Sequence, residues 1–171
     1  MTTTCANRLA AARRPADLRI IEQIKVGMCT EPSVARMTFD DPVGPLYPFT
    51  LNDKLAVITE PHEWYRSADN PWGAPIVPLE MIAPLLHQHS HMESLPISRP
   101  AVGLFLDQEI RVHDGPLLVG ESYVVRREVA AIGGRRRTES CWLRTEAADA
   151  TGRVRATMLL HLGFLRNSVA G

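Results

Sequence analysis

The chain has 171 residues, of which 45% are hydrophobic, and its 19 basic and 19 acidic side chains leave no formal net charge at pH 7. This length suits one domain with a proper core, and the balanced charge argues against nucleic acid or an anionic membrane surface as a partner. No apolar run is long enough to cross a bilayer as a helix. Cysteines 5, 29 and 141 lack the CxxC spacing of zinc or redox sites, so we expect reduced thiols in a cytoplasmic protein.

The first residues are rich in arginine and carry no acidic side chain before Asp17. Their short LAAA run falls below the apolar length that a secretory signal requires. We therefore expect an N-terminal arm over residues 1–17, disordered or helical, and a single domain over residues 18–171. Within residues 18–39 the pattern leaves two alternatives open, a pair of strands or a helix followed by a strand.

Prolines at positions 42, 45 and 48 then hold the chain extended on the way to Leu51. Thr59 is a good helix-capping residue, and Glu60 and Pro61 favour a first helical turn. We expect one or two helical turns from Glu60 to about Ser67.

The stretch WGAPIVPLEMIAPLLHQHSH, from Trp72 to His91, is the one long apolar segment with helical spacing. Pro78 suits a first helical turn, because its missing N–H would be unsatisfied there in any case. Pro84 falls inside the pattern and predicts a kink or a tight first turn, at a cost of about 3 kcal/mol unless packing compensates. The sequence predicts a central helix from Pro78 to His91.

After this helix the apolar residues recur at every second position, as in half-buried strands. The segments with this pattern are residues 101–112, 123–132 up to a turn at Gly133 and Gly134, 137–148 and 153–165. In the last one, a single face carries Val154, Ala156, Met158, Leu160, Leu162 and Phe164. The result is an antiparallel meander whose apolar face needs a cover, and the central helix is the only adequate one.

A curved antiparallel sheet wrapped around one long central helix is the α+β arrangement called the hot-dog fold. The pieces GAPIVP at the helix entry and HDGPLLVGESY before the second long strand, in this order, resemble MaoC-like acyl-thioester hydratases and dehydratases. The similarity covers roughly residues 42–166. It implies a coenzyme A or acyl-carrier-protein thioester as substrate, with no separate cofactor.

In that family a motif of the form S-G-D-x-N-P-x-H supplies an Asp and a His that act on a water and on the α-carbon of the thioester. This chain has Ser67-Ala68-Asp69-Asn70-Pro71-Trp72-Gly73 in its place, with one residue fewer and with Gly73 where the His would stand. The resemblance therefore leaves Asp69 as a candidate base without its usual partner. The alternative is that Asp69 only forms a turn before Asn70 and Pro71.

The helix entry offers a second kind of chemistry. Unsatisfied N–H groups at a helix N-terminus can polarise a thioester carbonyl, and the resemblance places this carbonyl at Gly73 and Ala74. Related hot-dog thioesterases use a carboxylate on the central helix, for which Glu80 is the candidate here. A first-turn Glu that merely complements the helix dipole is the alternative.

Other residues complete the predicted site. Tyr65 and Trp72 flank the expected substrate mouth, either lining an acyl pocket or packing over the sheet, and Asn70 adjoins them. Arginines 126, 127, 135, 136 and 137 form the one local excess of charge, and Arg135 and Arg136 could meet the phosphates of coenzyme A or an acidic carrier protein. His87, His89 and His91 do not share one helix face, so we expect no metal site but a solvated helix end.

These residues support three functions. The first is hydration of an enoyl thioester or its reverse, with Asp69 or Tyr65 assisting proton transfer. The second is a thioesterase that uses Glu80, and the third is a non-catalytic acyl-thioester-binding or assembly subunit. Because the edge of a single curved sheet is usually paired, we also expect a homodimer joined edge to edge.

Overall fold

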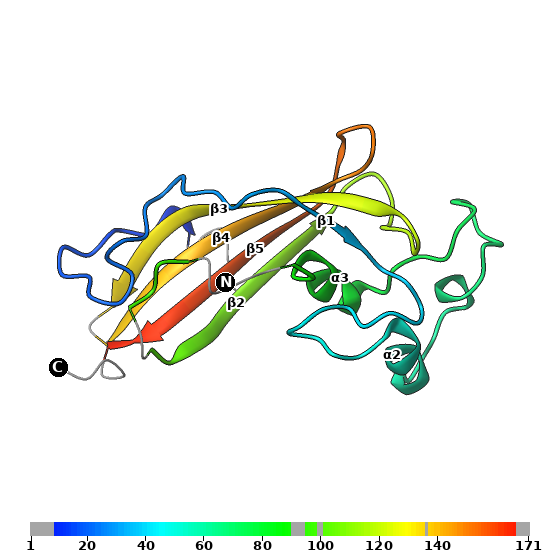
Figure 1. Ribbon diagram of the computed structural model, residues 1–171, viewed down its shortest axis with the longest axis horizontal. Coiled ribbons are helices and arrows are strands. Elements are labelled where there is room, and N and C mark those ends of the chain that lie inside the picture. Colours follow the sequence, from blue (N-terminus) through cyan, green and yellow to red (C-terminus); the bar gives the residue numbers. More distant parts are fainter. Residues whose placement is uncertain (1–8, 90–94, 99–100, 136, 167–171) are drawn as a thin grey trace.

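The structure is a computed structural model that describes residues 9–89, 95–98, 101–135 and 137–166. Its elements in chain order are β1 (Ser33–Arg36), α2 (Leu51–Val57), the 3-10 turn η1 (Glu63–Tyr65), α3 (Leu79–Leu86), β2 (Gly103–Val112), β3 (Ser122–Arg135), β4 (Thr138–Ala148) and β5 (Val154–Leu165). The five strands form one antiparallel sheet in the order β1-β3-β4-β5-β2, and the sheet curves across its length (Figure 1). The predicted meander of long strands is confirmed.

The concave face of the sheet carries the core, and strand alternation explains which residues reach it. In β5, Ala156, Met158 and Leu160 are buried in that core, so the predicted apolar face of the last strand is confirmed. The opposite face is also partly covered. There Trp142 and Leu159 are buried, with Leu9 and Ala12 of the N-terminal segment packed against them.

Helix α3 lies against the concave face, where it contacts β1 and β4. It buries Met81, Ile82 and Leu85 and contains Pro84. The helix begins directly after Pro78, as expected, but it has 8 residues and ends at Leu86, well before the predicted His91. Its last turn tightens, because the His87 N–H bonds to the carbonyl oxygens of residues 83 and 84 at 3.0 and 3.1 Å. The long helix of the prediction is thus a short one that covers only part of the concave face.

A different segment covers the other part. Leu18, Ile20, Ile21 and Ile24 are buried against the far ends of β3, β4 and β5 without forming a helix or strand. Glu139 at the start of β4 holds this segment in place. Its carboxylate is fully buried and accepts backbone N–H bonds from residues 19, 20 and 21 at 2.9, 2.8 and 3.1 Å. The alternatives predicted over residues 18–39 were a strand pair or a helix followed by a strand, and neither holds for residues 18–24. A strand does occur later in this range, as β1.

The region before α3 also differs from the prediction. The helix there is α2, which begins after Thr50 with a capping box in which Thr50 Oγ1 accepts the Asp53 N–H and the Asp53 carboxylate accepts the Thr50 N–H. The predicted helix from Glu60 to Ser67 is only the short η1 turn, capped by His62 rather than Thr59. The spacing of Thr50 and Asp53, three residues apart, was a usable signal for α2.

Gly133 and Gly134 do not form the predicted turn, because β3 continues through them to Arg135. Their role is close packing. A Cβ atom at Gly133 would lie 2.8 Å from Cζ3 of Trp142, and one at Gly134 would lie 2.8 Å from the carbonyl oxygen of Thr138. The glycines therefore leave room for the Trp142 ring and for the tip of the β3–β4 hairpin.

Candidate functional site

The segment between η1 and α3 carries an aromatic cluster. The rings of His62 and Trp64 meet edge to face at 4.7 Å, and those of Trp64 and Trp72 meet at 5.5 Å. Tyr65 is half-buried and packs against the main core. Trp64 therefore contacts Trp72, one of the two residues expected to flank the substrate mouth, and Trp72 keeps 40% of its surface exposed.

Asn70 organises the turn that follows. Its side-chain amide donates to the carbonyl oxygens of Ser67 and Ala74, both at 2.8 Å, and its Oδ1 accepts the Trp72 N–H at 2.9 Å. These three bonds occupy the side chain within its own turn. Both amide hydrogens are used in this way, so a donated bond from Asn70 to a substrate would require this turn to open.

Asp69 lies on the same turn. Its backbone N–H donates to Ser67 Oγ at 3.0 Å, and its side chain is exposed. This is the bonding of a turn former. The carboxylate is nevertheless accessible to a ligand that approaches from solvent.

Gly73 and Ala74 do not lie at the helix N-terminus. Gly73 has a φ of +69°, which favours glycine, and its N–H donates to the Asn70 carbonyl oxygen at 3.1 Å. Helix α3 begins five residues after Ala74, at Leu79. The N–H groups that project from the end of α3 are therefore those of Leu79 and Glu80 rather than those of the glycine turn.

Glu80 is exposed on the first turn of α3, and Lys54 of α2 lies 3.2 Å from its Oε1 atom. Both side chains are more than one-third exposed, so this pair contributes at most about 1 kcal/mol to stability. It does place a carboxylate beside the projecting N–H groups of α3. Of the predicted site residues, Glu80 is the one that the structure places at the helix end.

Arg135, one of the two arginines predicted to meet coenzyme A phosphates, is exposed near the tip of the β3–β4 hairpin, at the end of the sheet away from α2 and α3 (Figure 1). The other, Arg136, lies outside the described residues. The structure thus separates Arg135 from Asp69, Tyr65 and Glu80. It turns a different arginine inward. Arg127 shares a strand face with the buried residues Val125 and Val129, an alternation that was visible in the sequence but that we did not use.

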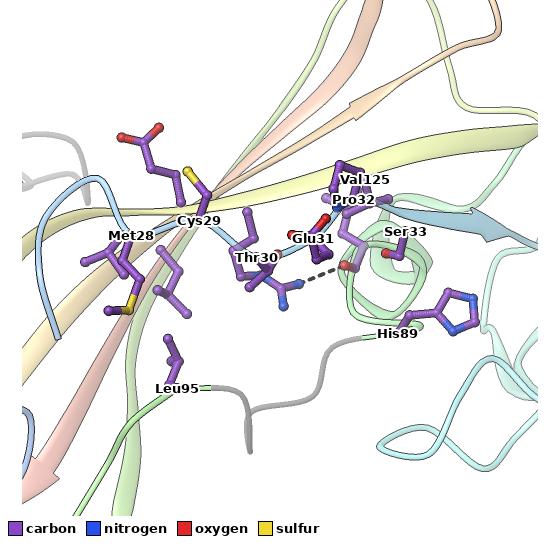
Figure 2. Close-up of a pocket in the computed structure, with 14 residues that line it drawn as sticks. Met28, Cys29, Thr30, Glu31, Pro32, Ser33, His89, Leu95 and Val125 are labelled. Atoms are coloured by element: carbon purple, nitrogen blue, oxygen red, sulfur yellow. Dashed lines mark hydrogen bonds between the residues drawn. The ribbon is translucent and has the colours of Figure 1, made fainter. Parts of the chain in front are cut away.

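A cavity of about 490 Å³ opens beside Arg127 (Figure 2). Met28 and Leu95 lie at one end of it, and Ser33 and His89 lie at the other. Its volume is typical of small-molecule sites, which range from about 300 to 1,000 Å³. It adjoins the C-terminal end of α3 through Leu86, at the opposite end of the helix from Glu80.

His87 closes the C-terminal end of α3. It had been expected to be solvated, but it is not. It is buried, its ring stacks on Tyr47 at 6.2 Å, and no described atom forms a hydrogen bond with its Nδ1. Burial, together with the nearby charge of Arg127, lowers the pKa of His87 to about 4. His89 is exposed, His91 lies outside the described residues, and no three His, Cys, Asp or Glu side chains gather into a metal site in the described ranges.

No family model and no curated protein sequence matches the chain significantly. Solved structures do match it. An (R)-hydratase from A. caviae involved in PHA biosynthesis is similar over 82% of this chain and 97% of its own, with a TM-score of 0.59 at 16% identity. A MaoC-like dehydratase from Rhodospirillum rubrum is similar over 86% of this chain and 97% of its own, with a TM-score of 0.60 at 14% identity.

The chain has a MaoC-like hot-dog fold. The HadBC (3R-hydroxyacyl-ACP dehydratase) complex from Mycobacterium tuberculosis shares this fold over 81% of the present chain and 96% of its own, with a TM-score of 0.63 at 16% identity. At such identities the likeness concerns the fold alone. In the described part of this hot-dog protein, no helix has the length and apolar character needed to cross a membrane.

Proposed function

We propose that the chain is an acyl-thioester hydratase/dehydratase-like protein that acts at the N-terminal end of α3. The observation that carries this proposal is the open first turn of the helix. Its N-cap residue, Pro78, makes no side-chain hydrogen bond to that turn, and both Leu79 and Glu80 are exposed there. N–H groups at such an end carry partial positive charge and stabilise the negative charge that develops on a thioester oxygen.

In this proposal the thioester carbonyl docks at the end of α3, with Trp72, Gly73 and Ala74 beside the acyl group. Hydration adds the oxygen of water to the β-carbon of an enoyl thioester and a proton to its α-carbon. Asp69 takes the proton from the water, and Tyr65 assists the transfer. Asn70 supports this arrangement by holding the turn on which Asp69 lies.

A specific observation favours each of two other functions. The position of Glu80 beside the helix end, held by Lys54, suits a thioesterase in which this carboxylate attacks the thioester or activates water. The glycine at position 73, where the related motif has a His, suits a non-catalytic protein that only binds acyl thioesters. Docking of coenzyme A phosphates or of a carrier protein on Arg135 and Arg136 stays a prediction for all three.

The test is incubation of the purified protein with a panel of enoyl- and 3-hydroxyacyl-coenzyme A esters. Absorbance reports loss or gain of the enoyl thioester, and a thiol reagent reports free coenzyme A. A hydratase changes the first signal alone and loses its activity in Asp69→Asn, whereas a thioesterase raises the second and loses its activity in Glu80→Gln. Glu121→Gln, an exposed carboxylate outside the proposed site, is the matched control.

If neither signal changes while acyl-coenzyme A binding is still detectable by calorimetry, the chain is the non-catalytic binder. If Asp69→Asn retains full hydratase activity, the assignment of the base is incorrect. Absence of both activity and binding across the panel would contradict the proposed function itself.

We also propose a homodimer joined through β2. This edge strand exposes Phe105 by 66%, Leu106 by 39% and Val112 by 37%, and exposed apolar sheet edges are usually covered. The HadBC structure, which shares this fold, is itself a complex, and this supports the proposal. Light scattering should give twice the chain mass for the native protein and the chain mass for Phe105→Lys. A native monomer would refute this proposal.

A further inference from the structure

The cavity of about 490 Å³ lies at the junction of two clusters of the core. Its apolar lining consists of Leu86 and Val125 from the cluster that contains α3, and of Met28, Leu95, Val129 and Leu143 from the cluster at the far half of the sheet. Close-packed interiors leave few voids larger than a water molecule, so a gap of this size is large enough for a ligand. The 8 residues of α3, at a rise of about 1.5 Å each, separate it by about 12 Å from the open helix end.

Three charged side chains contribute to the lining, and none of them serves as a counter-charge for a ligand. Arg127 braces the wall, since its Nε donates to Thr145 Oγ1 and its Nη2 to the Leu86 carbonyl oxygen, both at 3.0 Å; the second bond is the dashed line in Figure 2. Glu31 is exposed at the rim, where solvent and salt screen its charge. Glu128 follows Arg127 directly in β3, so strand alternation directs its side chain to the opposite face of the sheet. The enclosed part of the cavity therefore suits an uncharged ligand, because a charged group would lose its water there without gaining a partner.

The two ends of the cavity differ in polarity. Met28 and Leu95 lie at one end, and Ser33 and His89 lie at the other (Figure 2). Ser33 is half-buried and stands opposite Val125 in the β1–β3 ladder, which places both side chains on the same face of the sheet. Among the described residues, none forms a hydrogen bond with the Ser33 hydroxyl. One end of the cavity is thus apolar, and the other offers a hydroxyl that can donate and accept.

We propose that this cavity binds an uncharged single-chain amphiphile, a medium-chain primary alcohol, with its hydroxyl on Ser33 and its chain directed toward Met28 and Leu95. An alcohol hydroxyl both donates and accepts, so it pairs with a serine without a counter-charge. Removal of the alkyl chain from water along the apolar walls drives binding. This site is distinct from the thioester site, and it does not rest on the proposed function.

The experiment is isothermal titration calorimetry of the full chain with octan-1-ol, octanoate and octylammonium, which share one chain length and differ in charge. Octan-1-ol should bind, and each charged analogue should bind at least tenfold more weakly. Absence of octan-1-ol binding would overturn the proposed site. Binding of either charged analogue as tightly as octan-1-ol would overturn the assignment of an uncharged ligand.

Ser33→Ala tests the polar end with little change in shape. Loss of one hydrogen bond between uncharged groups should weaken octan-1-ol binding by about threefold to tenfold. Ser122→Ala, which removes an exposed hydroxyl of β3 outside the cavity, is the matched control and should bind octan-1-ol as the native protein does. Native-like binding by Ser33→Ala would refute the placement of the ligand hydroxyl.

Met28→Trp tests the apolar end, because the larger side chain fills the space assigned to the alkyl chain. It should weaken octan-1-ol binding at least tenfold. Val26→Trp is the matched control, since Val26 is 60% exposed on the same segment and does not line the cavity. Native-like binding by Met28→Trp, or loss of octan-1-ol binding in Glu80→Gln at the other end of α3, would refute the placement of the chain.

Discussion

Replacement of Glu139 tests how the non-helical half of the core is held. The carboxylate is fully buried, its Oε1 accepts the Arg19 N–H, and its Oε2 accepts the N–H groups of Ile20 and Ile21. Glu139→Gln keeps the shape but presents an NH₂ group to at least one of these donors. The loss of one charge-assisted bond should lower the free energy of unfolding by about 1.5–3 kcal/mol. Glu139→Ala leaves all three N–H groups and Arg166, whose Nε lies 3.5 Å from Oε1, without this partner, and should cost about 3–5 kcal/mol.

Urea unfolding followed by far-ultraviolet circular dichroism measures both changes. Glu146→Gln is the matched control, because Glu146 is exposed on the same strand and should change stability by less than about 0.5 kcal/mol. Hydrogen exchange adds a local measurement, since the amides of Ile20 and Ile21 should exchange faster in Glu139→Gln. If Glu139→Gln unfolds at the same urea concentration as Glu146→Gln, the carboxylate does not anchor this segment and the reasoning is refuted.

Two further changes act elsewhere in the core. Because the pKa of His87 falls from its ordinary 6.5 to about 4, the unfolded chain takes up this proton first as the pH drops. Stability should therefore decline between about pH 6.5 and 4, by about 3 kcal/mol in all, and His87→Phe should lose that part of the pH dependence in urea titrations at several pH values. An unchanged slope in His87→Phe would contradict the assignment. Gly133→Ala should lower the free energy of unfolding by about 1–3 kcal/mol through its clash with Trp142, whereas Gly103→Ala, whose Cβ would have no neighbour closer than 3.9 Å, should not.

The sequence was most informative where one physical rule acts alone. Two-residue alternation in residues 153–165 identified the buried face of β5, because a strand with one buried face must alternate. Pro78 likewise marked the start of α3, since its missing N–H is harmless only in the first turn. In both cases a local pattern is compatible with only one conformation of low free energy.

Patterns that depend on distant partners were harder to interpret. The segment around Ile20 and Ile24 is apolar without a period, and what fixes it is a carboxylate more than 100 residues later in the chain. The same holds for Gly133. A pair of glycines predicts a turn, but this glycine instead leaves room for the Trp142 ring, which the local sequence does not indicate. The length of the helix was misjudged for a local reason. The prediction carried it through the polar residues 87–91, His-Gln-His-Ser-His, but the tightened last turn ends the helix at Leu86.

In the candidate site, too, a residue placed from a local pattern was predicted better than residues placed by analogy. Glu80 could be assigned to the helix start from sequence, and it does lie there, whereas Gly73 and Ala74 were assigned by analogy and lie five or more residues before the helix. This difference moves the proposed carbonyl site from a glycine turn to the N–H groups of Leu79 and Glu80. It also places Glu80 beside these N–H groups, whereas the exposed Asp69 side chain lies on the turn before the helix.

The short helix has a consequence for ligand binding. Here the cover of the concave face consists of two unlike pieces, α3 and the segment anchored by Glu139. Side chains from both pieces, Leu86 of α3 and Met28 of the other segment, line the 490 Å³ cavity. Met28 is held to β3 by a backbone bond of its own, because its carbonyl oxygen accepts the Val129 N–H at 2.9 Å. Weakening the anchor at Glu139 should therefore loosen residues 19–21 while leaving any chemistry at the far end of α3 intact.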